Sequence, residues 1–337
     1  MIRYGCLNEQ EKRAYELFLE TFESRGTVID ARSIRDVDPM KVLNAVLGDH
    51  PRFVYFNKTQ ISTVSGVMGP KEYRLTGVLS GEKLRRQEQA LEQAVQRAME
   101  EVELANPMND FDRLTVIYEY IQDHVVYDQA ELERVCRGSH RNPDAHSAYG
   151  ALCQGKAVCD GIADAFCLLA QRLGYECTCV SGKSAFRTQG KSSHAWNVIR
   201  VKDKFYHVDA TWDVNQKEAS GDYCYEYFCV DDDAIATDHV WEMGIVPFCT
   251  GREMSWYHRS RCFANNLSQA EDIFRRVSKS KQCIVRVRIS DAIPIPEPAG
   301  QYLAERLRAC SSAVGRYSGF RYGWNKDSRC FYGRFHE

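Results

Sequence analysis

The stretch between Tyr149 and Asp213 constrains the fold most, because it places reactive residue types at the starts of regular elements. Cys159 precedes apolar residues at helical spacing, and Gly174 suits the C-terminal cap of that helix. A thiol at a helix N-terminus lies near free N–H groups and the positive end of the dipole, which lower its pKa and favour the thiolate. We therefore predict that Cys159 is a nucleophile rather than a buried, inert cysteine.

Two segments rich in β-forming residues follow, at 194–201 and 204–209. A two-residue turn between them makes His194 and Asp209 diagonal neighbours on one face, with their Cβ atoms about 7–8 Å apart. A shift of the register by one residue would place them on opposite faces. The pattern predicts a triad in which His194 is the base for Cys159 and Asp209 orients the imidazole.

Four further residues are candidates for the same site. The side chain of Gln154 could add a donor for an oxyanion, with an ordinary surface glutamine as the alternative. Trp196 and Trp212 flank the strands that carry the histidine and the aspartate, and we expect them to wall the site. Asp213 would compete with Asp209 as the orienting carboxylate if the second strand continued that far.

Three motifs, AVCDGIADAF, HAWNVIRV and FYHVDATWD, resemble those of transglutaminase-like cysteine peptidases, a branch of the papain-like fold. The resemblance implies an α+β fold, with the catalytic Cys159 at a helix N-terminus packed on an antiparallel sheet, and catalytic roles for His194 and Asp209. The later segment YEYFCVDDDAIATDHVW is also similar to the family, and within it we interpret His239 as structural. One departure is Ile162, where the family often has a tyrosine. That change would alter packing or substrate contacts and leave the triad intact.

A triad of this kind predicts cysteine-dependent acyl transfer on the amide bonds of a peptide or protein, without a cofactor. With water as acceptor the chain would be a peptidase or amidase, which the resemblance favours. With a lysine amine as acceptor it would be a protein-crosslinking transglutaminase. A catalytically silent binding module that keeps the fold is the third alternative, and the complete triad argues against it.

The composition and the sequence patterns limit which binding partners and which cellular compartment we expect. The chain has 337 residues, 44% hydrophobic and 27% charged, and its net charge of −2 gives no reason to expect nucleic acid or an anionic membrane as a partner. No apolar run approaches a bilayer span and no signal-peptide pattern opens the chain, which favours the cytoplasm. The missing signal pattern also favours reduced thiols for the fourteen cysteines, and since they include no CxxC pair we expect no metal site.

Length favours more than one lobe, and we expect three regions. A mixed α/β, mainly helical N-terminal region would cover 1–128, the catalytic core 129–250, and an α/β C-terminal region 251–337. The first long helix should begin with a capping box formed by Asn8 and Glu11.

Local patterns give three more expectations. Residues 129–148 lack periodicity and predict a polar connection in which His140 and His146 are solvated. Residues 223–230 have the pattern of a strand. The basic and aromatic segment 315–335 predicts a terminal hairpin that packs against a helix rather than binding single-stranded nucleic acid.

Overall fold

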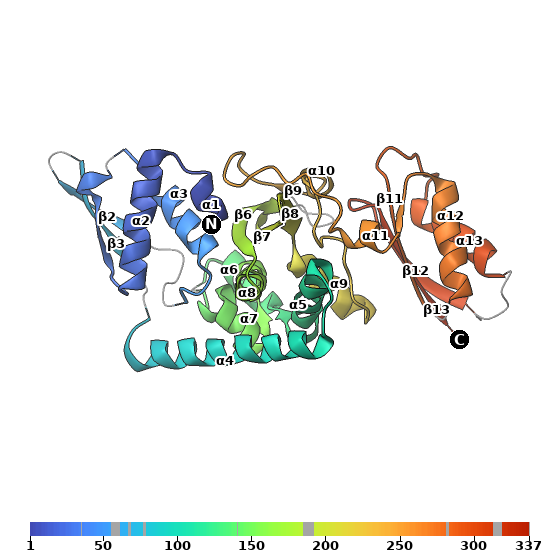
Figure 1. Cartoon of the computed structure of the whole chain (residues 1–337), viewed down its shortest axis with the longest axis horizontal. Coiled ribbons are helices and arrows are strands. Elements are labelled where there is room, and N and C mark those ends of the chain that lie inside the picture. Colours follow the sequence, from blue (N-terminus) through green and yellow to red (C-terminus); the bar gives the residue numbers. More distant parts are fainter. Residues whose placement is uncertain are drawn as a thin grey trace.

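Three groups of elements lie side by side along the long axis of the molecule, in the order of the chain (Figure 1). The structure, a computed structural model, describes residues 1–34, 36–54, 61–66, 69–76, 79–139, 141–184, 192–280, 283–312 and 319–336. His140 lies outside the described residues. The fold is α+β, as predicted, and every described sheet of three or more strands contains antiparallel pairs.

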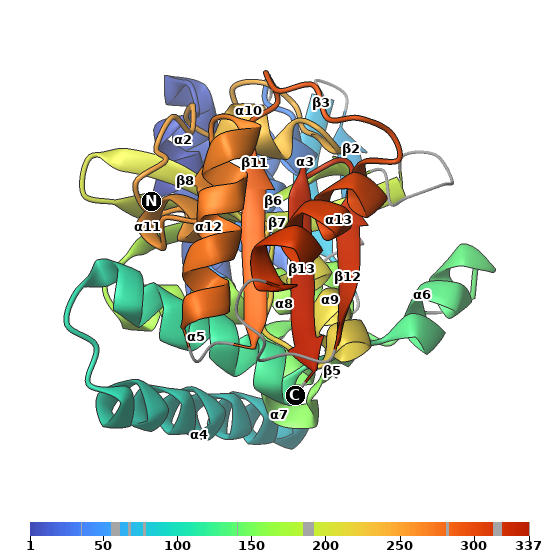
Figure 2. The same ribbon diagram turned by 90° about the vertical axis from the view of Figure 1, so that its right-hand side faces the viewer.

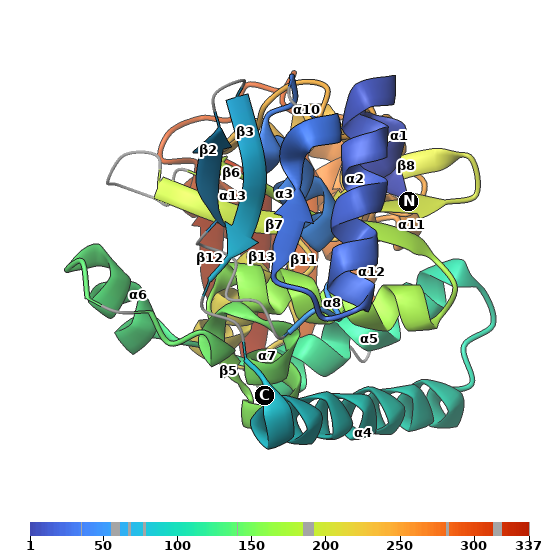
Figure 3. The same cartoon turned by 90° about the vertical axis from the view of Figure 1, so that its left-hand side faces the viewer.

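The N-terminal group packs helices on a small antiparallel sheet of order β1-β3-β2 (Figure 3). The predicted capping box is confirmed, because Asn8 accepts the N–H of Glu11 while the Glu11 carboxylate accepts the N–H of Asn8. The elements are α1 (Ile2–Gly5), α2 (Glu9–Glu23), β1 (Val28–Asp30), the 3₁₀-helix η1 (Ala31–Ser33), α3 (Pro39–Asp49), β2 (Ile61–Gly66) and β3 (Gly69–Leu75).

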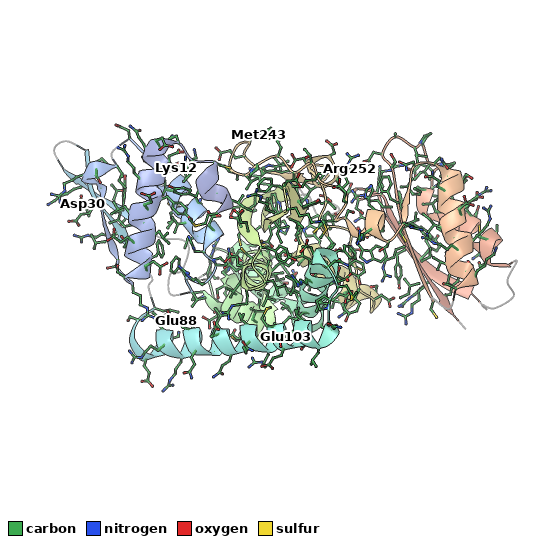
Figure 4. The ribbon with its side chains drawn as sticks, viewed as in Figure 1. Lys12, Asp30, Glu88, Glu103, Met243 and Arg252 are labelled. Atoms are coloured by element: carbon green, nitrogen blue, oxygen red, sulfur yellow. The ribbon has the colours of Figure 1, made fainter. Side chains whose placement is uncertain are left out.

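A long helix, α4 (Gly81–Ala105), runs beneath the N-terminal and central groups (Figure 1). Its apolar stripe, which includes Leu91 and Val95, is buried against the central helices α5, α7 and α8. Glu88 lies on the side of α4 that faces the N-terminal group (Figure 4), where it pairs with Arg25, just after α2.

The central group is an antiparallel sheet of order β8-β7-β6-β9 with helix α8 packed on β6 and β7. Helix α5 packs on the other side of α8 and also contacts α9. The elements are α5 (Asp110–His124), β4 (Val126–Tyr127), α6 (Gln129–Cys136), η2 (Asp144–His146), α7 (Ala148–Gln154), β5 (Lys156–Ala157), α8 (Cys159–Arg172), β6 (Glu176–Ser184), β7 (Ser192–Val201), β8 (Lys204–Val208), α9 (Ala210–Ser220), α10 (Asp232–Ile235) and β9 (His239–Val240).

Three local predictions in this group are wrong. Segment 129–148 is not an irregular connection, because α6 and η2 form there, and α6 projects from the side of the molecule (Figures 2 and 3). The second strand of the hairpin ends at Val208, and the chain turns into α9. Residues 223–230 form no strand beyond a single bridge between Val230 and His207, since their polar groups bond to helices instead.

The C-terminal group contains a mixed sheet of order β10-β11-β13-β12, whose outer face is covered by α12 and α13 (Figure 2). The predicted terminal hairpin is confirmed as β12 and β13. None of the helices built from the described residues is long and apolar enough to cross a membrane. The elements are α11 (Trp256–Arg259), β10 (Phe263–Ala264), α12 (Leu267–Lys279), β11 (Ile284–Ile289), α13 (Ala299–Ser312), β12 (Gly319–Asn325) and β13 (Cys330–His336).

Candidate active site

Cys159 is the first residue of α8, where the sequence predicted it, and its side chain is half-buried. The backbone N–H groups of Asp160 and of Ala195, on β7, both interact with the thiol. The contact with Ala195 brings the thiol to the strand that carries His194, the residue before it. N–H groups in the first turn of a helix have no acceptor within the helix, so this turn can offer donors to an oxyanion.

The predicted lowering of the thiol pKa is wrong. Burial raises the pKa of Cys159 to about 12, and the nearby carboxylates of Asp160 and Asp209 add to the increase. The N–H groups of Ala195 and Asp160 act in the opposite direction and are outweighed. The thiol therefore keeps its proton at neutral pH until a base removes it.

His194 and Asp209 lie together, as the predicted register requires. Strands β7 and β8 pair through Asn197 and Val208 with a two-residue turn, and Nε2 of His194 lies 2.7 Å from Oδ2 of Asp209. Both side chains are buried. Asp209 is the N-cap of α9, and its Oδ1 accepts the N–H of Thr211 at 2.9 Å. Burial would raise the pKa of Asp209, but the charge and hydrogen bonds of the adjacent histidines hold it well below its usual range.

The two tryptophans contact the imidazole of His194, although neither opens onto the solvent. The ring of Trp196 stacks on it at a centroid distance of 6.0 Å, and Nε1 of Trp212 lies 3.0 Å from Nε2 of His194. Trp196 is fully buried and donates its own N–H to Nδ1 of His207. Both indoles therefore fix the orientation of the imidazole from behind.

The side chains of Gln154 and Asp213 bond to residues outside the predicted triad. Gln154 is exposed at the end of α7, and its amide donates to Asp144 at 3.0 Å. Asp213 lies in α9 rather than on a strand, and its Oδ2 accepts a 2.6 Å hydrogen bond from Tyr118. The oxyanion role of Gln154 stays a prediction, whereas the strand position expected for Asp213 is wrong.

Tyr127 is a site residue that the sequence did not reveal. It lies on β4, which pairs in parallel with β5 just before Cys159. Burial raises the pKa of the Tyr127 hydroxyl, and the next contributions come from Cys159, Asp160 and Asp209. The hydroxyl thus lies within electrostatic range of both the nucleophile and the orienting carboxylate.

His146 is a second such residue, although it was expected to be solvated. Its Nδ1 lies 2.8–2.9 Å from the two carboxylate oxygens of Asp160, and its Nε2 lies 3.3 Å from Glu131. Gly161 permits this approach, since a Cβ there would lie 2.6 Å from the carbonyl oxygen of Ala145. Burial would lower the pKa of His146, but the bond to Asp160 raises it overall, which favours the imidazolium form next to this carboxylate.

His239 extends the triad on the far side of Asp209. Its Nε2 lies 3.0 Å from the same oxygen, Oδ2, that bonds to His194, and its Nδ1 bonds to Asp238. Asp238 in turn accepts a hydrogen bond from the hydroxyl of Tyr227. All of these side chains are buried. The TDHVW similarity marked this position, but only the fold shows which carboxylate it meets.

A small cavity of about 180 Å³ lies beside the nucleophile and is enclosed in part by the N-terminal group. Helix α3 contributes one wall, and the residues next to Cys159 and His194 contribute another. The cavity-lining residues are Asn44, Leu47, Gly48, Arg141, Asp160, Asp164, Cys179, Ser181 and Ala195.

Among the residues that the structure describes, two groups of side chains have the spacing of metal ligands. They are His194 with Asp209 and His239, and His207 with Asp232 and Cys249. In both groups, histidine nitrogens already bond to carboxylates at 2.7–3.0 Å. We therefore interpret both as hydrogen-bonded clusters. The fourteen cysteines form no disulfide in the structure.

Comparison with known proteins agrees with the geometry. Residues 97–210 match the family model of the transglutaminase-like superfamily, a range that includes Cys159, His194 and Asp209 and ends before His239. The chain is 25% identical over 180 residues to kyphoscoliosis peptidase of Mus musculus, covering 48% of this chain and 26% of that protein. Against the Homo sapiens protein of the same name it is 29% identical over 110 residues, covering 31% and 16%.

The chain thus spans about a quarter or less of the length of these curated relatives. Among solved structures, a TGase aligns over 45% of this chain and 44% of its own, at 14% identity and a TM-score of 0.33. A candidate cysteine protease from Cytophaga hutchinsonii aligns over 45% of this chain and 61% of its own, at 15% identity and a TM-score of 0.28.

Proposed function

We propose that this chain, which carries a transglutaminase-like domain at residues 97–210, is a cysteine-dependent acyl-transfer enzyme that hydrolyses amide bonds of peptides or proteins. The observation that carries the proposal is the 2.7 Å hydrogen bond between His194 and Asp209. His194 lies on β7, and the N–H group of the next residue, Ala195, reaches the Cys159 thiol.

The geometry assigns a role to each ring nitrogen of His194. Because Nε2 faces Asp209, Nδ1 is the nitrogen that would exchange a proton with the thiol and with the leaving amine. The thiol pKa is raised, so His194 would take the proton as Cys159 attacks the carbonyl carbon. The acyl-enzyme then forms, the C–N bond breaks, and the proton passes to the amine. Water, deprotonated by His194, releases the acid and restores the thiol.

The group that accepts the acyl chain from Cys159, water or an amine, distinguishes the proposal from its alternatives. The names of the curated relatives support hydrolysis, whereas the name of one solved neighbour, a TGase, points to transfer to an amine. A silent binding module would catalyse neither reaction. We also propose a compartment that keeps thiols reduced, such as the cytoplasm, in which the proposed nucleophile Cys159 would remain a thiol.

The test is digestion of a peptide library by the purified wild-type chain, Cys159→Ala and Cys153→Ala. Cys153 is a matched control, because it is another half-buried cysteine only six positions upstream, on α7. We expect cleavage by wild type and Cys153→Ala and none by Cys159→Ala. Incorporation of a fluorescent primary amine into a glutamine-containing protein, without hydrolysis, would instead identify a crosslinking enzyme. Equal cleavage by Cys159→Ala would refute the proposed nucleophile.

A further inference from the structure

The carboxylate of Asp209 is shared by two imidazoles at a single oxygen. Oδ2 lies 2.7 Å from Nε2 of His194 and 3.0 Å from Nε2 of His239, while Oδ1 is occupied by the N–H of Thr211. A triad needs only one imidazole on its carboxylate, so the second must be explained by another role.

His239 is itself held between two carboxylates. Asp209 bonds to its Nε2 and Asp238 to its Nδ1, and a ring bonded to carboxylates through both nitrogens donates from both, which is the protonated form. Burial would lower the pKa of His239, but these two hydrogen bonds raise it to about 9. A buried positive charge therefore lies next to the triad at neutral pH.

We propose that His239 is a positioning residue for the triad: its charge offsets part of the negative charge of the Asp209 carboxylate and so favours the thiolate of Cys159. The inference rests on the proposed function, because it assigns His194 as the base. The ring centroids of the two histidines lie 5.3 Å apart, within the range at which one charge affects the other. His239 does not line the small cavity beside Cys159. Its loss should therefore affect proton transfer rather than substrate affinity.

The direction of the effect follows from the groups around His239. Asp209, Asp238 and Tyr227 bond in this network, and His194 and His207 are the nearby imidazoles, with Lys183 and Ser184 on the neighbouring strand β6. Removing one positive charge here destabilises the thiolate of Cys159, so the pKa of this thiol should rise.

The test uses His239→Gln, which keeps an N–H donor but removes the charge. The pH dependence of iodoacetamide labelling gives the pKa of Cys159. We expect its midpoint to rise by about 1 pH unit. His207→Gln, at a buried histidine bonded to Asp232 instead, should leave the midpoint in place.

Asp238→Asn is a second test if His239→Gln does not fold. This variant keeps the imidazole of His239 and removes a carboxylate that stabilises its protonated form. The labelling midpoint of Cys159 should rise here too, by less. An unchanged midpoint in a folded variant would overturn the inference, as would an equal rise in His207→Gln. The titration needs no substrate. A rise in a chain that cleaves no amide would therefore refute the proposed function and leave the role of His239 standing.

Discussion

The hydroxyl of Tyr118 donates a 2.6 Å hydrogen bond to Oδ2 of Asp213, and this bond fixes the Asp213 carboxylate in the interior between α5 and α9. Burial raises the pKa of Asp213 well above its ordinary value, and the charge of Glu226 raises it further. Burial therefore favours the neutral acid at Asp213, whereas the adjacent histidines favour the ionised carboxylate of Asp209. Only the latter can stabilise an imidazolium.

Matched variants at these two aspartates should therefore behave differently. We expect Asp209→Asn to lower kcat by roughly 10²-fold or more, because the amide can no longer stabilise the imidazolium of His194. Asp213→Asn should change kcat by less than about threefold, since an amide resembles the protonated acid. Turnover of one amide substrate by the two variants, at equal folded fraction, measures the difference. A larger loss in Asp213→Asn would reverse the assignment.

Asp160→Asn should make the nucleophile easier to ionise. The Asp160 carboxylate raises the thiol pKa of Cys159 and is offset by His146, so its removal should move the labelling midpoint down by about 1 pH unit. His146→Gln should move the midpoint up. Asp144→Asn is the control, because Asp144 bonds to Gln87 and Gln154 instead. An equal downward shift of the midpoint in Asp144→Asn would show that the midpoint follows the net charge of the protein, and would contradict a specific effect of Asp160.

Tyr127→Phe tests the residue that the sequence did not indicate. Its hydroxyl lies within electrostatic range of Cys159 and Asp209, and we expect it to stabilise charge that develops during attack. The variant should lose about tenfold in kcat while its free energy of unfolding changes by less than about 1 kcal/mol. Tyr120→Phe, at a tyrosine that stacks on His124, is the control and should keep wild-type turnover. Equal kcat for Tyr127→Phe and wild type would exclude this role.

Stability should fall as the pH rises through the titration of His239. Its pKa is raised from 6.5 to about 9, so between these values the folded state binds more protons than the unfolded state. The stabilisation is complete below pH 6.5 and disappears through pH 9. Chemical denaturation at several pH values should show His239→Gln losing less stability than wild type over this window, by on the order of 2 kcal/mol.

His207→Gln is the control for that measurement. Burial lowers the pKa of His207, so this residue is already neutral near pH 7 and adds no loss of stability above it. If wild type and His239→Gln lost the same amount of stability between pH 6.5 and 9, His239 would not carry the proposed charge.

The central geometry could be predicted because a few residues determine it. Apolar spacing after Cys159 defined a helix start, and the two-residue turn fixed the register that brings His194 to Asp209. The sequence did not predict where the second strand of the hairpin ends. Asp209 suits both a strand end and an N-cap, and the bond from Thr211 decides in favour of the cap.

The remaining site residues depend on contacts between distant segments. Tyr127 reaches the nucleophile through the parallel pair β4 and β5, and His146 reaches it through the space left by Gly161. Neither contact produces a period in the sequence. The thiol pKa was mispredicted for a related reason, because the helix position of Cys159 is local, whereas its burial and the carboxylate of Asp209 depend on the whole fold.

The hydrophobic clusters have a calorimetric consequence. One cluster extends from Leu7 to Cys229 and includes residues of both the N-terminal and central groups, whereas the C-terminal group has a separate cluster from Tyr257 to Phe335. Hydrogen bonds such as that from Asn325 to Glu226 join the C-terminal group to the rest. Heating should therefore give two heat-absorption peaks, with the first 250 residues melting as one cooperative unit. A fragment limited to residues 97–210 would expose half of a shared interior and should not fold.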